Sequence, residues 1–172
     1  MSISPLKLQD IPHMAQVQPH DWPDIRPHLR FYISAPNCFP VKYELGGNIA
    51  GIGTSYVHQD SAWLAHIIVA PAFRGQGIGG KIVGHILKEL DKRSIDTVLL
   101  EATTLGYPVY IRHGFEPVGK YQHYLIESPI SPTANQQLIL RPAGGEDFEK
   151  MLALDIKATG EIRHPTLSSY LA

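Results

Sequence analysis

The sequence has 172 residues, a length that suits one domain with a full hydrophobic core and leaves too little chain for a second complete one. Its formal net charge of -1 provides no broad basic field, which argues against nucleic acid and anionic membranes as partners. The first residues lack the pattern of a signal peptide, and no apolar run approaches the ~20 residues of a membrane span, so we expect a cytoplasmic protein.

Cysteine and histidine usage argues against a disulfide and against a metal. Cys38 is the single cysteine, so an internal disulfide is excluded and the thiol is expected to be a buried apolar group. The nine histidines show no helical or short-loop spacing with cysteine or carboxylate support. We therefore expect no structural metal.

The first part of the chain alternates short helices with strands. An expected strand over 3–8 leads to Asp10, which is placed to cap a helix with Ile11, Met14 and Val17 on its apolar face. The elements expected next are a short helix over 22–33, a strand over 38–45, a hairpin turn at 46–48, a strand over 49–58 and an apolar strand over 61–70.

A change of apolar period marks the next helix. Ile78, Ile82, Ile86 and Leu90 are spaced four apart, which predicts a core-facing helix over 79–93. The elements expected after it are a strand over 95–102, a short helix over 107–113 that ends at Gly114, and a strand over 116–127. This order is mixed α/β, with a run of strands leading into a strand-loop-helix-strand crossover.

Beyond residue 130 the sequence resembles its own beginning. Residues 3–17 and 140–154 align without a gap at one constant offset. Two explanations stay open: an internal repeat, or two unrelated segments that each begin with a strand followed by a capped helix. We expect a domain over 1–130, a Ser- and Pro-rich linker over 131–139, and a C-terminal extension over 140–172. The identities at this offset pair Pro5 with Pro142, Asp10 with Asp147, and Met14 with Met151.

The extension is too short for a core of its own. We expect a helix capped by Asp147 that runs to about Ala158 and ends at Gly160, with Met151 and Leu154 on its buried face. Its apolar side chains must pack on the domain or on another copy of the chain, so a homodimer is one of two arrangements left open.

The glycine-rich stretch APAFRGQGIGGKIV at 70–83 suggests a phosphate-binding loop, and two common forms of such a loop fit it poorly. A nucleotide-triphosphatase loop needs a Ser or Thr after Lys81, where the chain has Ile82. A dinucleotide fingerprint is formally present, with Glu101 as the ribose-binding acid, and makes an oxidoreductase a remote alternative. Five residues separate the strand from the first glycine, however, which is too many for that tight turn.

A third pattern explains Arg74 as well as the glycines. The stretch IIVAPAFRGQGIGGKIV resembles the strand-loop-helix motif of the GNAT superfamily of acyl-CoA-dependent N-acetyltransferases. LEATTLGYPVYIRHGF, at 100–115, resembles the family's later segment, in which Tyr110 stands four residues before Gly114-Phe115. The resemblance implies a GNAT fold of the α/β class, α+β in type: a mixed, mostly antiparallel sheet flanked by helices, here with a C-terminal helical extension.

The resemblance also implies a reaction, in which an acetyl group moves from acetyl-CoA to an amine by direct attack. It places Tyr110 as the general acid, leaves His66, Glu101 or an ordered water as the base, and leaves the acceptor as a small-molecule or protein amine. A non-catalytic acyl-CoA-binding module is the competing function. The residues implied in cofactor binding are Ile67, Ile68, Val69, Arg74, Gly75, Gln76, Gly77, Ile78, Gly79 and Gly80.

Overall fold

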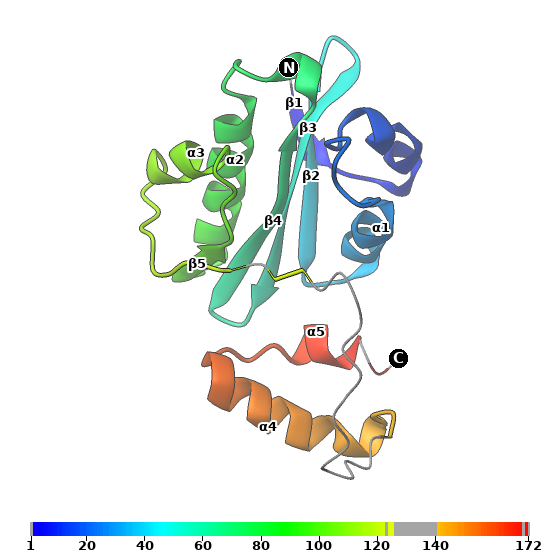
Figure 1. Cartoon of the computed structure of the whole chain (residues 1–172), viewed down its shortest axis with the longest axis vertical. Coiled ribbons are helices and arrows are strands. Elements are labelled where there is room, and N and C mark those ends of the chain that lie inside the picture. The colour runs from blue at the N-terminus through cyan, green and yellow to red at the C-terminus, as the bar shows by residue number, and fades with distance from the viewer. Residues whose placement is uncertain (1, 123, 126–140, 170, 172) are drawn as a thin grey trace.

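A computed structural model describes residues 2–122, 124–125, 141–169 and 171, and it contains one five-stranded sheet (Figure 1). The strand order follows the chain. The first three pairings are antiparallel, and the last, between β4 and β5, is parallel. The sheet is therefore mixed and mostly antiparallel, as expected. Its strands are β1 (Ser2–Pro5), β2 (Cys38–Leu45), β3 (Asn48–His58), β4 (Ser61–Val69) and β5 (Thr97–Leu100).

The turn between β2 and β3 confirms the hairpin predicted at 46–48. Gly46 and Gly47 both have positive φ, 59° and 80°, the left-handed conformation that a two-residue hairpin turn requires. Leu45 pairs with Asn48 directly across this turn. The register that this closure sets then shifts by one residue between Glu44 and Tyr43, so a β-bulge lies just beyond the turn.

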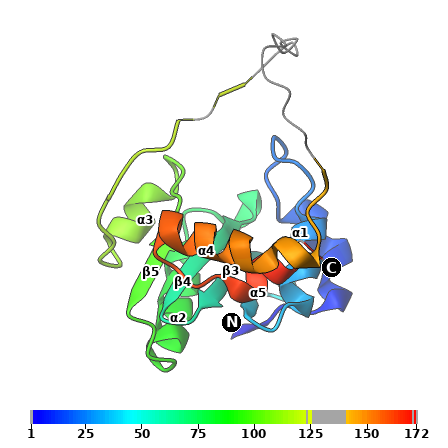
Figure 2. The same cartoon turned by 90° about the horizontal axis from the view of Figure 1, so that it is seen from below.

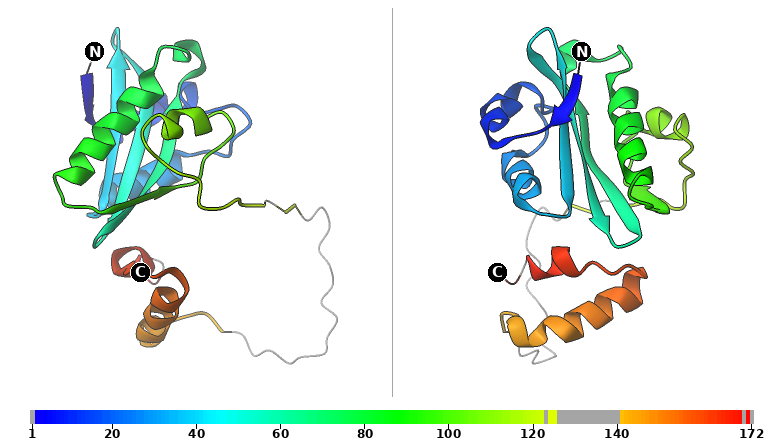
Figure 3. Two further views of the ribbon diagram at one scale, coloured as in Figure 1. Left: turned by 90° about the vertical axis from the view of Figure 1, so that its left-hand side faces the viewer. Right: turned by 180° about the vertical axis from the view of Figure 1, so that it is seen from behind.

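Helices cover both faces of the sheet (Figure 3). The 3-10 helix η1 (Leu8–Gln16) and α1 (Arg26–Ser34) pack on one face, where the core includes Met14 and Leu29. The other face carries α2 (Ile78–Asp91) and α3 (Tyr107–Ile111), together with Ile82 and Ile86 from the predicted stripe. A second short 3-10 turn, η2 (Pro71–Phe73), connects β4 to the glycine loop. None of the helices in the described residues is long and apolar enough to span a membrane.

The first helix differs from its prediction in type and in how it is capped. Residues 8–16 form a 3-10 helix with Pro12 inside it. Asp10 lies within the first turn, where its carboxylate accepts a hydrogen bond from the Lys7 backbone N–H at 2.8 Å and pairs with the Lys42 ammonium at 2.8 Å. The apolar face is confirmed, since Ile11, Met14 and Val17 are buried.

The strand predicted over 116–127 is wrong in the residues that the structure describes there, 116–122 and 124–125. These have no strand conformation, and Val118 and Leu125 are 91% and 88% exposed. A stretch rich in β-branched and aromatic residues forms a strand only when a neighbouring strand accepts its backbone hydrogen bonds. No strand in the described part of the chain pairs with this segment.

The C-terminal helix is confirmed, but its predicted buried face is not. The elements there are η3 (Gly145–Asp147), α4 (Phe148–Thr159) and α5 (His164–Ser168), and they lie across one end of the sheet (Figure 2). Gly160 ends α4 with φ of 74°. Of the predicted buried face, Leu154 is 67% exposed and Met151 is only half-buried. The predicted linker at 131–139 lies outside the described residues.

The two aligned openings share one local contact. The Asp147 carboxylate accepts a hydrogen bond from the Gly144 backbone N–H at 3.0 Å, as Asp10 does from Lys7, so donor and acceptor are three residues apart in both. Each carboxylate also binds a cation, Arg141 in the later copy. The contact makes the openings alike in structure as well as in sequence, while the internal repeat stays a prediction.

Candidate active site

The two parallel strands separate partway along their length, and this opens the sheet. Ser61–Leu64 of β4 pair with Thr97–Leu100, where β5 ends, while β4 continues to Val69. Ile67, Ile68 and Val69 therefore lie on the stretch of β4 that β5 does not cover. The opening leaves that stretch of backbone without a neighbouring parallel strand.

A bulge in β4 marks the start of this opening. The β3–β4 register shifts between Ile52 and Thr54, and opposite the shift His66 has a positive φ of 50°. A positive φ is uncommon for a residue with a side chain and is held only where the surroundings determine it. The bulge bends β4 at His66 and turns that side chain toward α1.

The glycine loop connects this strand to the start of α2. Gly75 and Gly77 have φ of 77° and 71°, and a Cβ at either position would meet nothing within 4 Å. Their requirement for glycine is therefore conformational, and the space beside them is open to a ligand. Arg74 is exposed, and its Nε donates to the Val69 carbonyl oxygen at 3.2 Å, so this side chain braces the loop against β4.

The remaining loop residues have different surroundings. Gln76 is exposed at the tip, whereas Ile78 is buried in the core as the first residue of α2. A Cβ on Gly79 would lie 3.6 Å from the Val69 side chain, and one on Gly80 would lie 3.5 Å from His113. The first turn of α2 thus packs closely on β4 and on His113, just beyond the end of α3. Helix N-termini with exposed backbone N–H groups favour phosphate groups.

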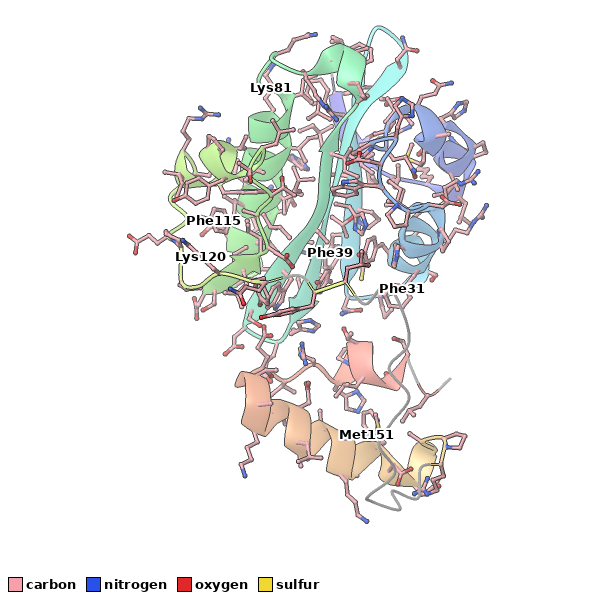
Figure 4. The ribbon with its side chains drawn as sticks, viewed as in Figure 1. Phe31, Phe39, Lys81, Phe115, Lys120 and Met151 are labelled. Carbon is pink, nitrogen blue, oxygen red and sulfur yellow. The ribbon has the colours of Figure 1, made fainter. Side chains whose placement is uncertain are left out.

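A basic hollow follows the loop along the outer side of α2, and it was missed in the sequence. Figure 4 shows Lys81 near the first turn of this helix. The spacing of the basic residues along the helix, four and then three residues apart, is a signal that could have revealed the hollow. Its volume is about 540 Å3, and its lining residues are Lys81, Gly84, His85, Leu87, Lys88 and His113.

Tyr110 lies in α3, next to α2 and in the same core cluster as Ile67 and Val69 of the opening. Its side chain is 9% exposed and contacts the Phe115 ring edge to face, with centroids 5.8 Å apart. Burial raises the pKa of its hydroxyl. The phenol therefore keeps its proton at neutral pH and can donate it.

His66 is the centre of a ring cluster on the α1 side of the sheet. The Tyr32 hydroxyl lies 3.2 Å from its Nδ1, and the His28 and Trp22 rings lie 5.5 and 6.3 Å from its ring centre. Burial, and then the nearby His28, lower the pKa of His66. The imidazole is thus neutral near pH 7, the state that accepts a proton. His28 was missed in the sequence, because no local pattern connects it with His66.

Glu101 directly follows β5 at the edge of the opening and is exposed. The structure therefore places three predicted catalytic residues on three separate elements around the opening: Tyr110 on α3, His66 on β4 and Glu101 after β5. Within the residues described, no three His, Cys, Asp or Glu side chains gather as metal ligands.

A mixed sheet whose parallel strands separate beside a glycine loop is the architecture of GNAT acetyltransferases. A family model described as "Acetyltransferase (GNAT) family" matches residues 8–115, and the chain belongs to this family. The protein is accordingly an acetyltransferase.

Two curated relatives are named for the same reaction. A putative ribosomal protein bS18-alanine N-acetyltransferase of Bacillus subtilis is 21% identical over 72% of this chain and 85% of its own length. The ribosomal protein bS18-alanine N-acetyltransferase of Escherichia coli is 36% identical over a shorter match, 32% of this chain and 37% of its own length. These are proteins that the chain is similar to.

Solved structures share the fold. The crystal structure of the ribosomal-protein-S18-alanine N-acetyltransferase from Escherichia coli has a TM-score of 0.60 at 23% identity, covering 69% of this chain and 79% of that one. A predicted acetyltransferase from Clostridium acetobutylicum, solved with acetyl-CoA, has a TM-score of 0.57 at 17% identity, covering 72% and 95%. At these identities the likeness concerns the fold.

Proposed function

We propose that this protein transfers the acetyl group of acetyl-CoA to the amino group of an alanine residue in a protein. One observation supports acetyl-CoA as the acetyl donor. A loop with two left-handed glycines leads into α2 beside the part of β4 that β5 leaves uncovered. The loop offers main-chain N–H groups to a pyrophosphate, and the uncovered strand offers backbone groups to the extended arm of the coenzyme. The basic hollow along α2 supplies positive charge beside the loop.

The residues around the opening fit direct transfer. The amine nitrogen attacks the thioester carbonyl, a C–N bond forms and the C–S bond breaks, so that CoA leaves as a thiolate. Tyr110 gives its hydroxyl proton to that sulfur, since the phenol is protonated at neutral pH and its burial raises the pKa further. A base takes the proton that the nitrogen loses. Holding both reactants in one site supplies much of the rate.

The acceptor is proposed from two independent supports. Curated relatives are named for acetylating alanine on a ribosomal protein. The ring cluster of Trp22, His28, Tyr32 and His66 lies on the α1 side of the sheet, away from the α2 side on which the loop opens. The α1 side of the sheet thus offers aromatic and hydrogen-bonding groups to a peptide, and the α2 side stays free for the coenzyme.

The experiment that tests the donor and the acceptor is an acetylation assay. Peptides with a free amino-terminal alanine, the same peptides with a blocked amino group, and small amines are offered with acetyl-CoA, and the product is identified by mass. We expect acetylation of the free peptide alone. Acetylation of small amines but no peptide would overturn the acceptor, and no thermal stabilisation by acetyl-CoA or CoA would overturn the donor.

His66 is proposed as the base, with Glu101 as the competitor. The pKa of His66 is lowered, so the acid limb of the kcat/KM profile should lie below the usual histidine value of about 6.5. His66→Gln should remove that limb and reduce kcat by roughly 10² or more, while Glu101→Gln should keep both. If the acid limb of the kcat/KM profile disappears in Glu101→Gln instead, Glu101 is the base.

A further inference from the structure

The C-terminal segment, defined here as residues 141–169, contacts the domain at the turn of the β3–β4 hairpin. Glu161 follows the glycine that ends α4, and it is the one buried residue among those described in this segment, with 9% exposure. A glutamate is rarely buried unless it is paired or hydrogen-bonded. The most deeply buried side chain of the segment is therefore a carboxylate and not an apolar group.

The hairpin supplies matched donors for this carboxylate. The Ser61 hydroxyl donates to Glu161 Oε1 at 2.5 Å, and the Trp63 indole N–H lies 3.1 and 3.0 Å from the two carboxylate oxygens. Both donors come from β4, on residues 100 and 98 positions earlier in the chain. Hydrogen bonds to an ionised group are about twice as strong as neutral ones, so two such donors define one position for Glu161.

The segment holds Glu161 in place from its own side. Its backbone N–H donates to the Thr159 hydroxyl at 3.1 Å, and Arg163 pairs with Asp155 of α4 through its Nε at 2.9 Å. Phe148 of α4 and His164 of α5 meet edge to face, with centroids 4.8 Å apart. These contacts fold α4 and α5 against each other and direct the carboxylate toward the hairpin.

Apolar burial in this segment is only partial, since Phe148, Met151, Leu152 and Leu167 are half-buried. Leu154, Ile156 and Ile162 are 67%, 38% and 42% exposed, and no residue of α4 or α5 described in the structure is buried. An attachment by apolar area would bury such side chains. We propose that Ser61 and Trp63 form a carboxylate-docking surface whose occupant is Glu161 of the same chain, and that this one residue determines whether the segment is docked or released.

The Trp63 indole provides a direct measurement in the full-length protein. The chain has two tryptophans, so two indole N–H signals are expected in a nitrogen-labelled spectrum, assigned through Trp22→Phe. Glu161→Ala should shift the Trp63 signal to that of a water-exposed indole and leave the Trp22 signal in place. Glu149→Ala, at an exposed position on α4, is the matched control and should move neither signal. An unmoved Trp63 signal in Glu161→Ala would refute the docking surface.

Mixing two chains separates docking within one chain from docking between copies. Labelled Glu161→Ala protein is combined with an excess of unlabelled wild type, so only the unlabelled chain carries the carboxylate. If docking is within one chain, the labelled Trp63 signal stays at its undocked position. Its return toward the docked position would show that the segment docks on a neighbouring copy, which contradicts the proposal.

A second variant keeps the proposal testable if Glu161→Ala folds poorly. Trp63→Phe keeps an aromatic ring, though a smaller one, and removes the indole N–H donor. Trypsin cleavage after Arg163 then reports release of the segment. Losing a hydrogen bond to a buried charge should speed this cleavage by about 5-fold or more, with cleavage inside the domain unchanged. An unchanged rate after Arg163 would mean that Trp63 does not hold Glu161.

Discussion

At the scale of single residues, environment decides what a side chain can do in the reaction. Tyr110 and Tyr107 occupy the same short helix, yet Tyr110 is 9% exposed and Tyr107 is 46% exposed. Burial raises the pKa of the Tyr110 hydroxyl, so this phenol is a proton donor over the whole neutral range. The four-residue spacing from Gly114 identified the candidate in the sequence, and the structure adds that its hydroxyl is buried beside Phe115.

Replacing Tyr110 with phenylalanine tests the donor role. Tyr110→Phe keeps the ring in its packed position and removes the hydroxyl, so kcat should fall by roughly 10² or more while acetyl-CoA affinity is retained. Steady-state kinetics and calorimetry measure the two quantities. Tyr107→Phe is the matched control on the same helix and should leave both unchanged, and a fully active Tyr110→Phe enzyme would remove Tyr110 from the mechanism.

At the scale of elements, the loop and α2 act as one unit. Gly75 and Gly77 provide the left-handed turns that bring the chain from β4 into the helix, and Arg74 ties the loop to the Val69 carbonyl oxygen. The apolar stripe of α2 then fixes the helix on the sheet, with Ile82 fully buried. The position of the helix N-terminus, and of any phosphate held there, follows from this packing.

Substitution of Gly77 tests this unit. A β-branched residue is strained at a φ of 71°, and its side chain would extend into the open space beside the loop. Gly77→Val should therefore weaken CoA binding by 10-fold or more, measured by calorimetry. Gly119→Val is the matched control, because that glycine also has open space but no positive φ, and it should bind CoA normally. If Gly77→Val and Gly119→Val bind CoA with equal affinity, the coenzyme does not bind at this loop.

At the scale of the whole molecule, a buried histidine lies where the C-terminal segment meets the domain. His58 is 1% exposed, and its Nδ1 has no hydrogen-bond partner among the described residues. Burial lowers its pKa most, Arg163 lowers it further, and Glu161 and Asp155 oppose the change. Because the folded state resists protonation of His58, the unfolded state binds more protons below about pH 6.5, and folding stability falls as the pH drops through that value.

This linkage predicts a pH-dependent melting temperature. The wild type should lose thermal stability between pH 7.5 and pH 5.5, and His58→Phe, which keeps a ring beside Tyr56, should lose less over the same interval. Calorimetry at both pH values gives the comparison, with His13→Gln as the control at an exposed position. If His58→Phe loses as much thermal stability as the wild type between pH 7.5 and pH 5.5, other groups cause the pH dependence.

Local patterns predicted most elements well. The β2 bounds are those predicted, the Gly46–Gly47 turn closes the hairpin, and the α2 stripe is buried as its spacing indicated. Each of these depends on residues within a few positions of one another. The segment after Gly114 shows the limit, because its predicted strand has no pairing strand in the described residues, and pairing is a property of two segments.

The amino-acid order by itself determined the family, the glycine loop and the candidate acid, because each is a contiguous motif whose chemistry depends on local backbone freedom and spacing. Tertiary structure alone decided which groups share a site. His66 meets Tyr32 across 34 positions, and Glu161 meets Ser61 across 100. Such contacts follow from how the sheet and its helices pack, and side-chain burial, which sets the pKa of His66 and Tyr110, exists only once that packing has formed.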